Sequence, residues 1–391
     1  MRYRPFLSHK RQPAKTVAYL KQQLCVRGAG GWKDTDDIPL GVDFLANCQT
    51  AIEHDTGGFI WWGTKDTLGS TVICETELPT ALDRAKRDPT YPVVPVLVDL
   101  KPGRDNAAIE AAIGPAYAKR LLSSNGILHH NGQSLQELAR ETARRYVGQL
   151  IRGLPAGPVD VAITAFRAPT EQHDLTLDWR SLFNPDSREL APGAHQTLVE
   201  ALTDIRAALQ ARARSPEVQV ELALPLPLAM LVGHEWRWTT QLKTTVNTVN
   251  PATGQMLTVA PGGPRSALAP AVRSGAPGGS GPFVLAVSVG TPLGATVERY
   301  ADEHAACAFE EMHVDRDPGV DPLDADDIRA LAALVVKRLN ELHAAGQKKH
   351  LLLRCPASLA GVIGLASNGT GPTWVPFYDG HDYYVGGVTI G

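Results

Sequence analysis

The sequence lacks several features that would narrow its function. Its formal net charge is −3 and only 20% of its residues are charged, so it has no basic excess of the kind that marks proteins that bind duplex DNA. It contains neither an uninterrupted apolar run long enough to span a membrane nor the charged start and apolar stretch of a secretory signal. We therefore expect a cytoplasmic protein with no membrane partner and no duplex DNA partner.

Cysteine and metal-binding patterns are also scarce. The five cysteines are widely spaced and lie mostly in apolar segments, which is typical of reduced, buried thiols: Cys25, Cys48, Cys74, Cys307 and Cys355. No CxxC or HExxH spacing occurs, and the pair His129-His130 has no further histidine at helical spacing. We therefore expect no metal site and no resident cofactor.

The first part of the chain has an alternating strand and helix pattern. Three short apolar segments bounded by Gly, Pro, Ser or Asp are typical of buried parallel strands: residues 2–8, 57–63 and 91–100. Between the first two, Val17, Leu20 and Leu24 share one face of a helix that we expect to end at Gly28. The pattern predicts an α/β domain built from βαβ units.

The length of 391 residues indicates two or three domains. A helix opened by a capping box of Ser134 and Glu137 should end at Gly153, where a Pro- and Gly-rich segment follows. We place the boundary there and predict domains at residues 1–153 and 154–391.

The second domain contains an internal repeat. "PLPLAMLVG" (Pro225–Gly233) and "PASLAGVIG" (Pro356–Gly364) share Pro-x-x-Leu-Ala-x-x-(Val/Ile)-Gly, are offset by 131 residues and each follow an apolar strand. The repeat predicts two fused α/β halves, at about 159–259 and 283–391. Residues 260–282 are so rich in Pro, Gly, Ser and Ala that we expect a linker without packed structure.

The stretch "LGSTVICETELPTALDRAK" follows the predicted strand at 57–63 and contains two glutamates, Glu75 and Glu77. Ligands of parallel sheets bind at the carboxyl ends of the strands, so this stretch is a candidate site. On a helical wheel Glu77 lies near the apolar stripe, whereas Glu75 faces the more polar side. Pro79 predicts that the helix either begins near Thr76 or kinks there, with Glu77 near an N-terminal turn.

Three segments together resemble a TIR domain. "FLSHKR" resembles its first-strand signature, "WKDTDDIPLG" its second strand and BB loop, and "ICETELPTAL" its W-x-x-x-E helix, so the resemblance covers about residues 1–152. It implies a flavodoxin-like fold and cleavage of the nicotinamide–ribose bond of NAD, a consumed substrate, with Glu77 as the catalytic residue. The non-catalytic alternative is that Glu77 is a solvated helix residue and that the domain is only an adaptor.

The resemblance also implies residues that bind NAD. Ile73 stands where the motif has Trp, so Trp32, Trp61 or Trp62 can supply the aromatic wall instead. Ser8 and the neighbouring cations can bind the diphosphate or ribose, although those cations are equally explained as a solvated loop. The BB-loop positions often contact a neighbouring TIR domain. The predicted NAD-binding residues are Ser8, Lys10, Arg11, Trp32, Asp34, Gly41, Trp62 and Ile73.

The second domain resembles a SAVED domain, which is built from two CARF-like Rossmann units and binds cyclic oligonucleotides. "LPLPLAMLVGHEW", "HLLLRCPASLAGVIGLASNGT" and "WVPFYDGHDYY" carry this resemblance. Cations and rings in these segments can hold phosphates and stack bases, although tryptophans near a helix end are as readily core residues. The predicted nucleotide-binding residues are Trp236, Arg237, Trp238, Arg354, Pro356, Ser358, Ser367, Asn368, Tyr378 and Tyr383.

The two resemblances together indicate a TIR-SAVED effector of CBASS-type anti-phage defence. In that interpretation a cyclic oligonucleotide, with a trinucleotide favoured by the family, drives self-association into an oligomer or filament, and the TIR domain then hydrolyses NAD. The alternative is a non-enzymatic TIR adaptor controlled by a nucleotide sensor. A sugar or nucleoside hydrolase is disfavoured because the aspartate cluster expected of one is missing.

Overall fold

The computed structural model describes residues 3–10, 14–31, 43–123, 128–166, 172–184, 189–249, 256–263, 266–316, 321–379 and 383–391. The chain divides into two compact units. Unit 1 comprises Met1–Ala156, Pro169–Ser181 and Ala207–Arg212, and unit 2 comprises Gly157–Ala168, Leu182–Arg206 and Ala213–Gly391. No helix in these described ranges is long and apolar enough to cross a membrane.

Unit 1 alternates strands with helices. Its strands are β1 (Pro5–Ser8), β2 (Gly58–Gly63), β3 (Val93–Leu97), β4 (Leu128–His129) and β6 (Leu175–Asp178). Its α-helices are α1 (Ala14–Val26), α3 (Phe44–Thr50), α4 (Leu78–Arg87), α5 (Asn106–Ile113), α6 (Pro115–Leu122) and α7 (Leu135–Gly153). Shorter helical turns are η1 (Ala51–Asp55), η2 (Lys65–Gly69), η3 (Val72–Glu77) and η4 (Arg180–Leu182).

Strands β1 to β4 form one parallel sheet in the order β1-β2-β3-β4. The apolar segments that predicted the first three strands form β1, β2 and β3, which confirms the βαβ interpretation of this region. The second strand expected within "WKDTDDIPLG" lies outside the described residues, so the flavodoxin-like strand order stays a prediction.

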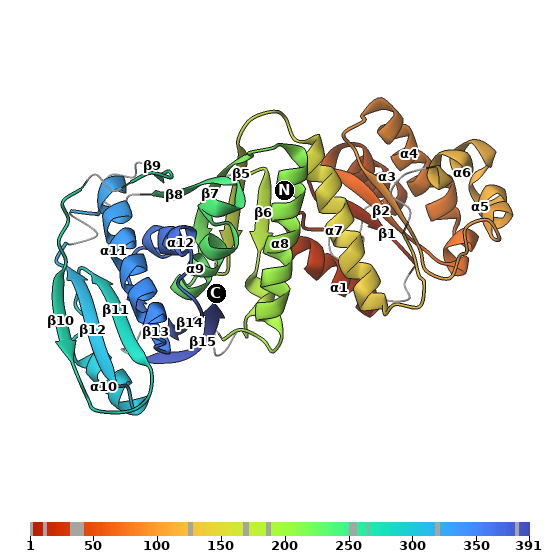
Figure 1. Ribbon diagram of the computed structural model, residues 1–391. Helices are drawn as coiled ribbons and strands as arrows, with labels where there is room; N and C mark the ends of the chain where they lie inside the picture. The colour runs from red at the N-terminus through yellow and green to blue at the C-terminus, as the bar shows by residue number, and fades with distance from the viewer. Residues whose placement is uncertain are drawn as a thin grey trace. The chain divides into compact units, whose positions relative to one another are not determined.

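Helices cover both faces of this sheet. One face carries a core to which β1, β2, η3 and α4 contribute, including the stacked rings of Phe6 and Phe59 at 5.6 Å. On the other face α1 and α7 lie side by side and α7 contacts β3 and β4 (Figure 1). Because alternate side chains of a strand point to opposite faces, Trp61 faces the first core and Trp62 the side of α1 and α7.

Local signals set the helix ends as the sequence predicts. Ser134 and Glu137 make the reciprocal capping box that opens α7. Helix α1 ends at Val26, and Gly28 adopts a φ of +95°, a left-handed conformation that only glycine takes without strain. Gly28 also packs against Leu175 and Leu177 of β6, a strand that the sequence did not signal.

Unit 2 contains two sheets. Its strands are β5 (Val159–Thr164), β7 (Glu217–Ala223), β8 (Lys243–Val249), β9 (Met256–Val259), β10 (Ala271–Gly275), β11 (Phe283–Val289), β12 (Ala308–Val314), β13 (Lys349–Arg354), β14 (Thr373–Tyr378) and β15 (Tyr384–Ile390). Its helices are α8 (Ala194–Arg212), whose last residues belong to unit 1, α9 (Leu226–Glu235), η5 (Trp238–Thr240), α10 (Ala295–Glu303), α11 (Ala325–Ala344) and α12 (Ala357–Ala366).

Each sheet of unit 2 has a parallel centre and an antiparallel strand at one edge or both. Strands β5, β7 and β8 are parallel and β9 pairs with β8 in the antiparallel sense. The second sheet has the order β10-β12-β11-β13-β14-β15, with β10 and β15 antiparallel to their neighbours. The prediction of a linker without packed structure at residues 260–282 is therefore wrong, because Ala271–Gly275 pairs with β12 as an edge strand.

The two copies of the repeat form the equivalent helices α9 and α12. Pro225 and Pro356 precede them with nearly equal backbone angles, φ −55° and ψ 144° against φ −59° and ψ 144°. The helices lie side by side (Figure 1), and a Cβ on Gly233 or Gly364 would collide with the backbone of the opposite helix. The repeat thus supplies a symmetric glycine contact at which two helices touch backbone to backbone.

Candidate functional site

Glu77 lies where a π-helical turn passes into an α-helix. The turn η3 ends at Glu77, and the N–H of Leu78 bonds to the carbonyl of Ile73, five residues back. Pro79 in the first turn of α4 has no N–H to donate, so the regular α-helical ladder cannot run through it. This confirms that Glu77 lies near an N-terminal turn, and π-turns of this kind recur at functional sites.

The carboxylate of Glu77 is buried and held by Ser8. The Ser8 hydroxyl, at the carboxyl end of β1, donates to Glu77 Oε2 at 2.6 Å. Glu77 is 5% exposed and Ser8 1%, whereas Glu75 is exposed, as the helical wheel predicts. A carboxylate is costly to bury unless it is hydrogen-bonded, so this pair marks a position where the fold retains a charge.

The other residues predicted to bind NAD are distributed differently. Lys10 is exposed, and its ammonium donates to the carbonyl of Asp66 at 3.2 Å. Ile73 is buried in the core beside Glu77. Trp62 is buried on the sheet face opposite to Glu77, so the structure does not bring it to the carboxylate. Arg11, Trp32, Asp34 and Gly41 lie outside the described residues.

Cys74 is the other reactive group near Glu77, and the structure keeps it protonated. Burial and the charges of Glu75 and Glu77 raise the pKa of the thiol. Its sulfur contacts the carbonyl of Thr67 at 3.4 Å. A protonated, buried thiol is a poor nucleophile, so the carboxylate is the better candidate of the two for a chemical role. Within the described ranges no group of His, Cys, Asp and Glu side chains is arranged to hold a metal ion.

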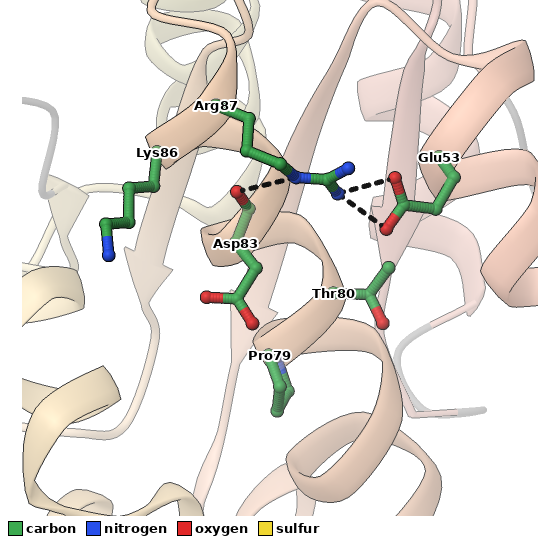
Figure 2. Close-up of a pocket in the computed structure, with 6 residues that line it drawn as sticks. All are labelled: Glu53, Pro79, Thr80, Asp83, Lys86 and Arg87. Carbon is green, nitrogen blue, oxygen red and sulfur yellow. Dashed lines mark hydrogen bonds and ion pairs between the residues drawn. The ribbon is translucent and has the colours of Figure 1, made fainter.

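A separate groove of about 660 Å³ crosses the outer surface of α4 (Figure 2) and is lined by Glu53, Pro79, Thr80, Asp83, Lys86 and Arg87. Arg87 forms a two-pronged ion pair with Glu53 at 2.7 and 2.8 Å. Burial is the largest single influence on the pKa of the Asp83 carboxyl and raises it, but the hydrogen bonds from Tyr117 and Arg120 and the nearby positive charges together outweigh burial and lower the pKa. Neither Ser8 nor Glu77 lines this groove, so it is distinct from the buried pair.

Unit 2 contains a pocket of about 310 Å³ where strands of both of its sheets end. The lining comes from the carboxyl ends of β5, β7, β13 and β14 and from the first turn of α9. The lining residues are Phe166, Glu189, Leu224, Pro225, Leu226, Pro227, Leu353, Pro376, Phe377, Tyr378, Asp379 and Val385. Apolar walls with a few polar groups are typical of a small-molecule site.

Of the residues predicted to bind a nucleotide, only Tyr378 lines this pocket. Arg354 lies over its ring, with the guanidinium carbon 5.8 Å from the ring centre. Pro356 and Ser358 open α12, and the buried Ser358 hydroxyl has no hydrogen-bond partner among the described residues. Tyr383 is 47% exposed and stacks with Arg299 at 4.0 Å, and Asn368 is exposed.

The segment "HEWRWTT" is part of the core of unit 2. Trp236 is fully buried and its indole N–H donates to Leu202 O at 3.1 Å, so its ring offers no exposed face to a base. Trp238 likewise donates to Thr244 O at 3.0 Å. Arg237 donates to His234 Nε2 at 2.8 Å, and the other ring nitrogen of His234 meets Ser367 Oγ at 2.9 Å.

Burial, together with the charges of Arg237 and Arg206, lowers the pKa of His234 to about 4. His234 is therefore neutral at pH 7 and can accept from Arg237 while donating to Ser367. The three residues tie the end of α9 to the end of α12, a role that the repeat alone does not reveal.

Sequence reasoning missed most of the pocket lining. Phe166, Leu226 and Phe377 look like ordinary apolar residues in the sequence, and only the meeting of the two sheets brings them together. The available signal was the rule that ligands bind at the carboxyl ends of parallel strands, since Leu224 and Tyr378 lie at such ends.

No family model and no curated protein matches this chain. Among solved structures, the Acinetobacter baumannii Cap4 SAVED/CARF-domain receptor with the cyclic trinucleotide 2'3'3'-cAAA is similar, with a TM-score of 0.50 at 10% identity, over 90% of this chain and 86% of that one. The Moraxella osloensis Cap4 SAVED/CARF-domain receptor aligns with a TM-score of 0.44 at 10% identity, over 100% of this chain and 87% of that one. The likeness to the first structure is one of fold, a mixed α/β architecture like that of SAVED/CARF receptors.

Proposed function

We propose that this protein is an NAD-cleaving effector of anti-phage defence, switched on by a cyclic oligonucleotide. In this proposal unit 1 hydrolyses the nicotinamide–ribose bond of NAD with Glu77, and unit 2 binds the activator in the pocket lined by Leu226 and Tyr378. The observation that carries the enzymatic part is the buried Ser8–Glu77 pair at the carboxyl end of a parallel strand.

The proposed reaction needs little besides a positioned carboxylate. The bond between the ribose C1′ and the ring nitrogen breaks, and its electron pair neutralises the pyridinium, so nicotinamide leaves uncharged. A carboxylate beside the ribose stabilises the oxocarbenium-like transition state and orients its hydroxyls. Water then adds to C1′ and loses a proton, which gives ADP-ribose. A carboxylate in a site shielded from water acts more strongly than one in solution.

The burial of the Ser8–Glu77 pair supports control of this activity by self-association. Glu77 is 5% exposed and Ser8 1%, so a substrate as large as NAD cannot reach the carboxylate unless the site opens. An activator can shift such an equilibrium only by binding the open arrangement better than the closed one. Association of several chains in the presence of the activator would supply that preference, and it keeps the single chain inactive.

The activator pocket is supported by its position, size and lining. It lies where strands of both sheets end, which is where open parallel sheets bind ligands. Proline, leucine and aromatic side chains can sandwich a base, and Arg354 near Tyr378 can meet a phosphate. The similar A. baumannii receptor was solved with a cyclic trinucleotide, which makes that ligand class the first to test here.

The test combines binding with turnover. The full chain is titrated by calorimetry with cyclic di-, tri- and tetranucleotides, and nicotinamide release from NAD is followed by chromatography with and without each ligand. We expect tight binding of at least one trinucleotide and release only in its presence. Binding without release would favour the adaptor alternative, and the absence of binding by any ring size would contradict the sensor.

A further inference from the structure

The register of β1 and β2 places Trp61 beside the Ser8–Glu77 pair. Ser8 and Trp61 are partners in the parallel ladder, so their side chains point to the same face of the sheet, on strands about 4.8 Å apart. The Ser8 hydroxyl shows which face this is, because it binds Glu77. Trp61 is therefore a direct neighbour of the residue that holds the carboxylate, whereas Trp62 faces the other way.

The ring of Trp61 extends toward the carboxyl end of its strand. A Cβ on Gly63, the last residue of β2, would lie 2.9 Å from both Cζ2 and Cη2 of the ring and 3.0 Å from Cε2. The ring thus covers Gly63 and reaches the rim of the sheet where Ser8 ends β1. Glycine at this position provides the space, since any side chain there would displace the indole.

Trp61 also belongs to the buried cluster that contains residues before and after Glu77 in the chain. It shares one buried cluster with Ile73 and Cys74 of η3 and with Leu78 of α4. Its indole N–H is fully buried and has no hydrogen-bond partner among the described residues. Buried tryptophans usually satisfy this donor, because an unpaired buried N–H destabilises the fold. The indole N–H of Trp62 is also buried and also has no partner among the described residues, so the two tryptophans differ in the face of the sheet that they occupy and not in this donor.

We propose that Trp61 is a positioning residue for NAD cleavage, which supplies from the strand the aromatic side chain that Ile73 lacks on the helix. The inference rests on the proposed function. The large ring fixes the π-turn that ends at Glu77 and keeps water from its carboxylate. In this proposal the large aromatic side chain next to the catalytic carboxylate comes from strand β2, as Trp61, and the helix carries the smaller Ile73.

Trp62 gives a matched control for the test, because it is the next residue of the same strand, equally large and buried, but on the opposite face. Trp61→Phe and Trp62→Phe are compared in the full chain at saturating activator, with kcat, KM for NAD and the unfolding midpoint measured for each. We expect comparable losses of stability. Trp61→Phe should lower kcat about 10- to 100-fold with KM changed less than about threefold, because small displacements of a catalytic group act on turnover. Trp62→Phe should keep kcat within about twofold.

An exchange variant tests the same idea independently. Trp61→Leu should lose most turnover, and adding Ile73→Trp should restore at least about 10-fold, because contacting residues are not additive. Equal kcat in Trp61→Phe and Trp62→Phe, with a wild type that releases nicotinamide, would overturn the role of Trp61 and leave the proposed function intact. A wild type that binds an activator but releases no nicotinamide would overturn both.

Discussion

The buried pair of unit 1 and the pocket of unit 2 both lie at the carboxyl ends of parallel strands, and they differ in what occupies them. In unit 1 side chains of the protein fill this position: Ser8 is hydrogen-bonded to Glu77, and Ser8, Glu77 and Trp61 are all buried. In unit 2 the corresponding position is hollow, with about 310 Å³ between apolar walls. In the proposed function the same topology thus serves a catalytic carboxylate in unit 1 and a bound ligand in unit 2.

The difference follows from the demands of the two tasks. A catalytic carboxylate gains strength from a fixed position and exclusion of water, so its surroundings are dense. A binding pocket gains affinity from surface that the ligand covers, so its walls must leave space before the ligand arrives. Changes that remove the charge, fill the space or move the walls should therefore affect the two units in different ways.

The largest effect is expected from removing the charge. Glu77→Gln keeps the shape of the side chain but cannot stabilise a positive transition state, so nicotinamide release should fall at least about 10³-fold. Activator binding, measured by calorimetry, should not change. Glu75→Gln is the matched control on the same turn and should keep full activity. Turnover by Glu77→Gln at the wild-type rate would remove the carboxylate from the mechanism.

The next effect comes from filling the hollow pocket. Leu226→Trp adds an indole to the wall at the start of α9 and should weaken activator binding about 100-fold, or ~2.7 kcal/mol. Leu226→Met, which hardly changes the volume, should bind normally. Without activator the two variants should have the same low NAD-cleaving activity. If Leu226→Trp binds as tightly as the wild type, the activator site lies elsewhere in the molecule.

Moving the walls is expected to cost stability in unit 2. A Cβ at Gly364 would collide with the carbonyl of Met230, so Gly364→Ala must push α9 and α12 apart. We expect a loss of about 1–3 kcal/mol in the free energy of unfolding, measured with urea. Gly369 is a control glycine with open surroundings and a φ of +78°. Replacing it by Asn, which tolerates that conformation, should lower the free energy of unfolding less than Gly364→Ala does. An unchanged midpoint in Gly364→Ala would mean that the helices are not in backbone contact.

A loss of stability of similar size is expected from loosening the carboxylate. Ser8→Ala removes a hydrogen bond to a charged group, so the free energy of unfolding should fall by about 1.5–3 kcal/mol. Nicotinamide release should fall less than in Glu77→Gln because the carboxylate remains. Ser8→Thr keeps the hydroxyl and should recover part of both losses. If Ser8→Ala leaves the midpoint of urea unfolding unchanged, Ser8 does not hold the charge.

The smallest effect concerns pH and is confined to unit 2. His234 has a pKa of about 4 in the folded chain against an ordinary 6.5, so between these values the unfolded chain binds a proton that the folded chain does not. Stability should therefore fall as the pH drops from 6.5 toward 4. His234→Gln should flatten this dependence in urea titrations at several pH values. His350, whose pKa burial also lowers to about 4, contributes in the same direction and limits how flat the profile becomes.

Features with a local cause were predictable from the sequence. Three such features depend only on neighbours within a few residues. They are the capping box of Ser134 and Glu137, the end of the first helix near Gly28, and the fact that Glu77 is buried while Glu75 is exposed. The internal repeat was also predictable, because its spacing of 131 residues is preserved. The glycine contact between its two helices gives that repeat a physical reason.

Features that depend on distant pairing were not predictable. Ala271–Gly275 looks like linker sequence and becomes a strand only because β12 offers it an edge. Trp61 and Trp62 are indistinguishable in the sequence, and only the register between β1 and β2 assigns one of them to the carboxylate. Trp236 was predicted to stack on a base, but it is buried. Its burial depends on packing against α8, which is distant in the sequence.

In the proposed function, binding of a cyclic oligonucleotide to unit 2 switches on the carboxylate of unit 1. The most direct measurement is the rate of nicotinamide release from NAD by one preparation of the full chain, before and after a cyclic trinucleotide that it binds is added. We expect a rise of at least about 100-fold, abolished by Glu77→Gln. Release that is equally fast without any nucleotide, or that persists in Glu77→Gln, would contradict it.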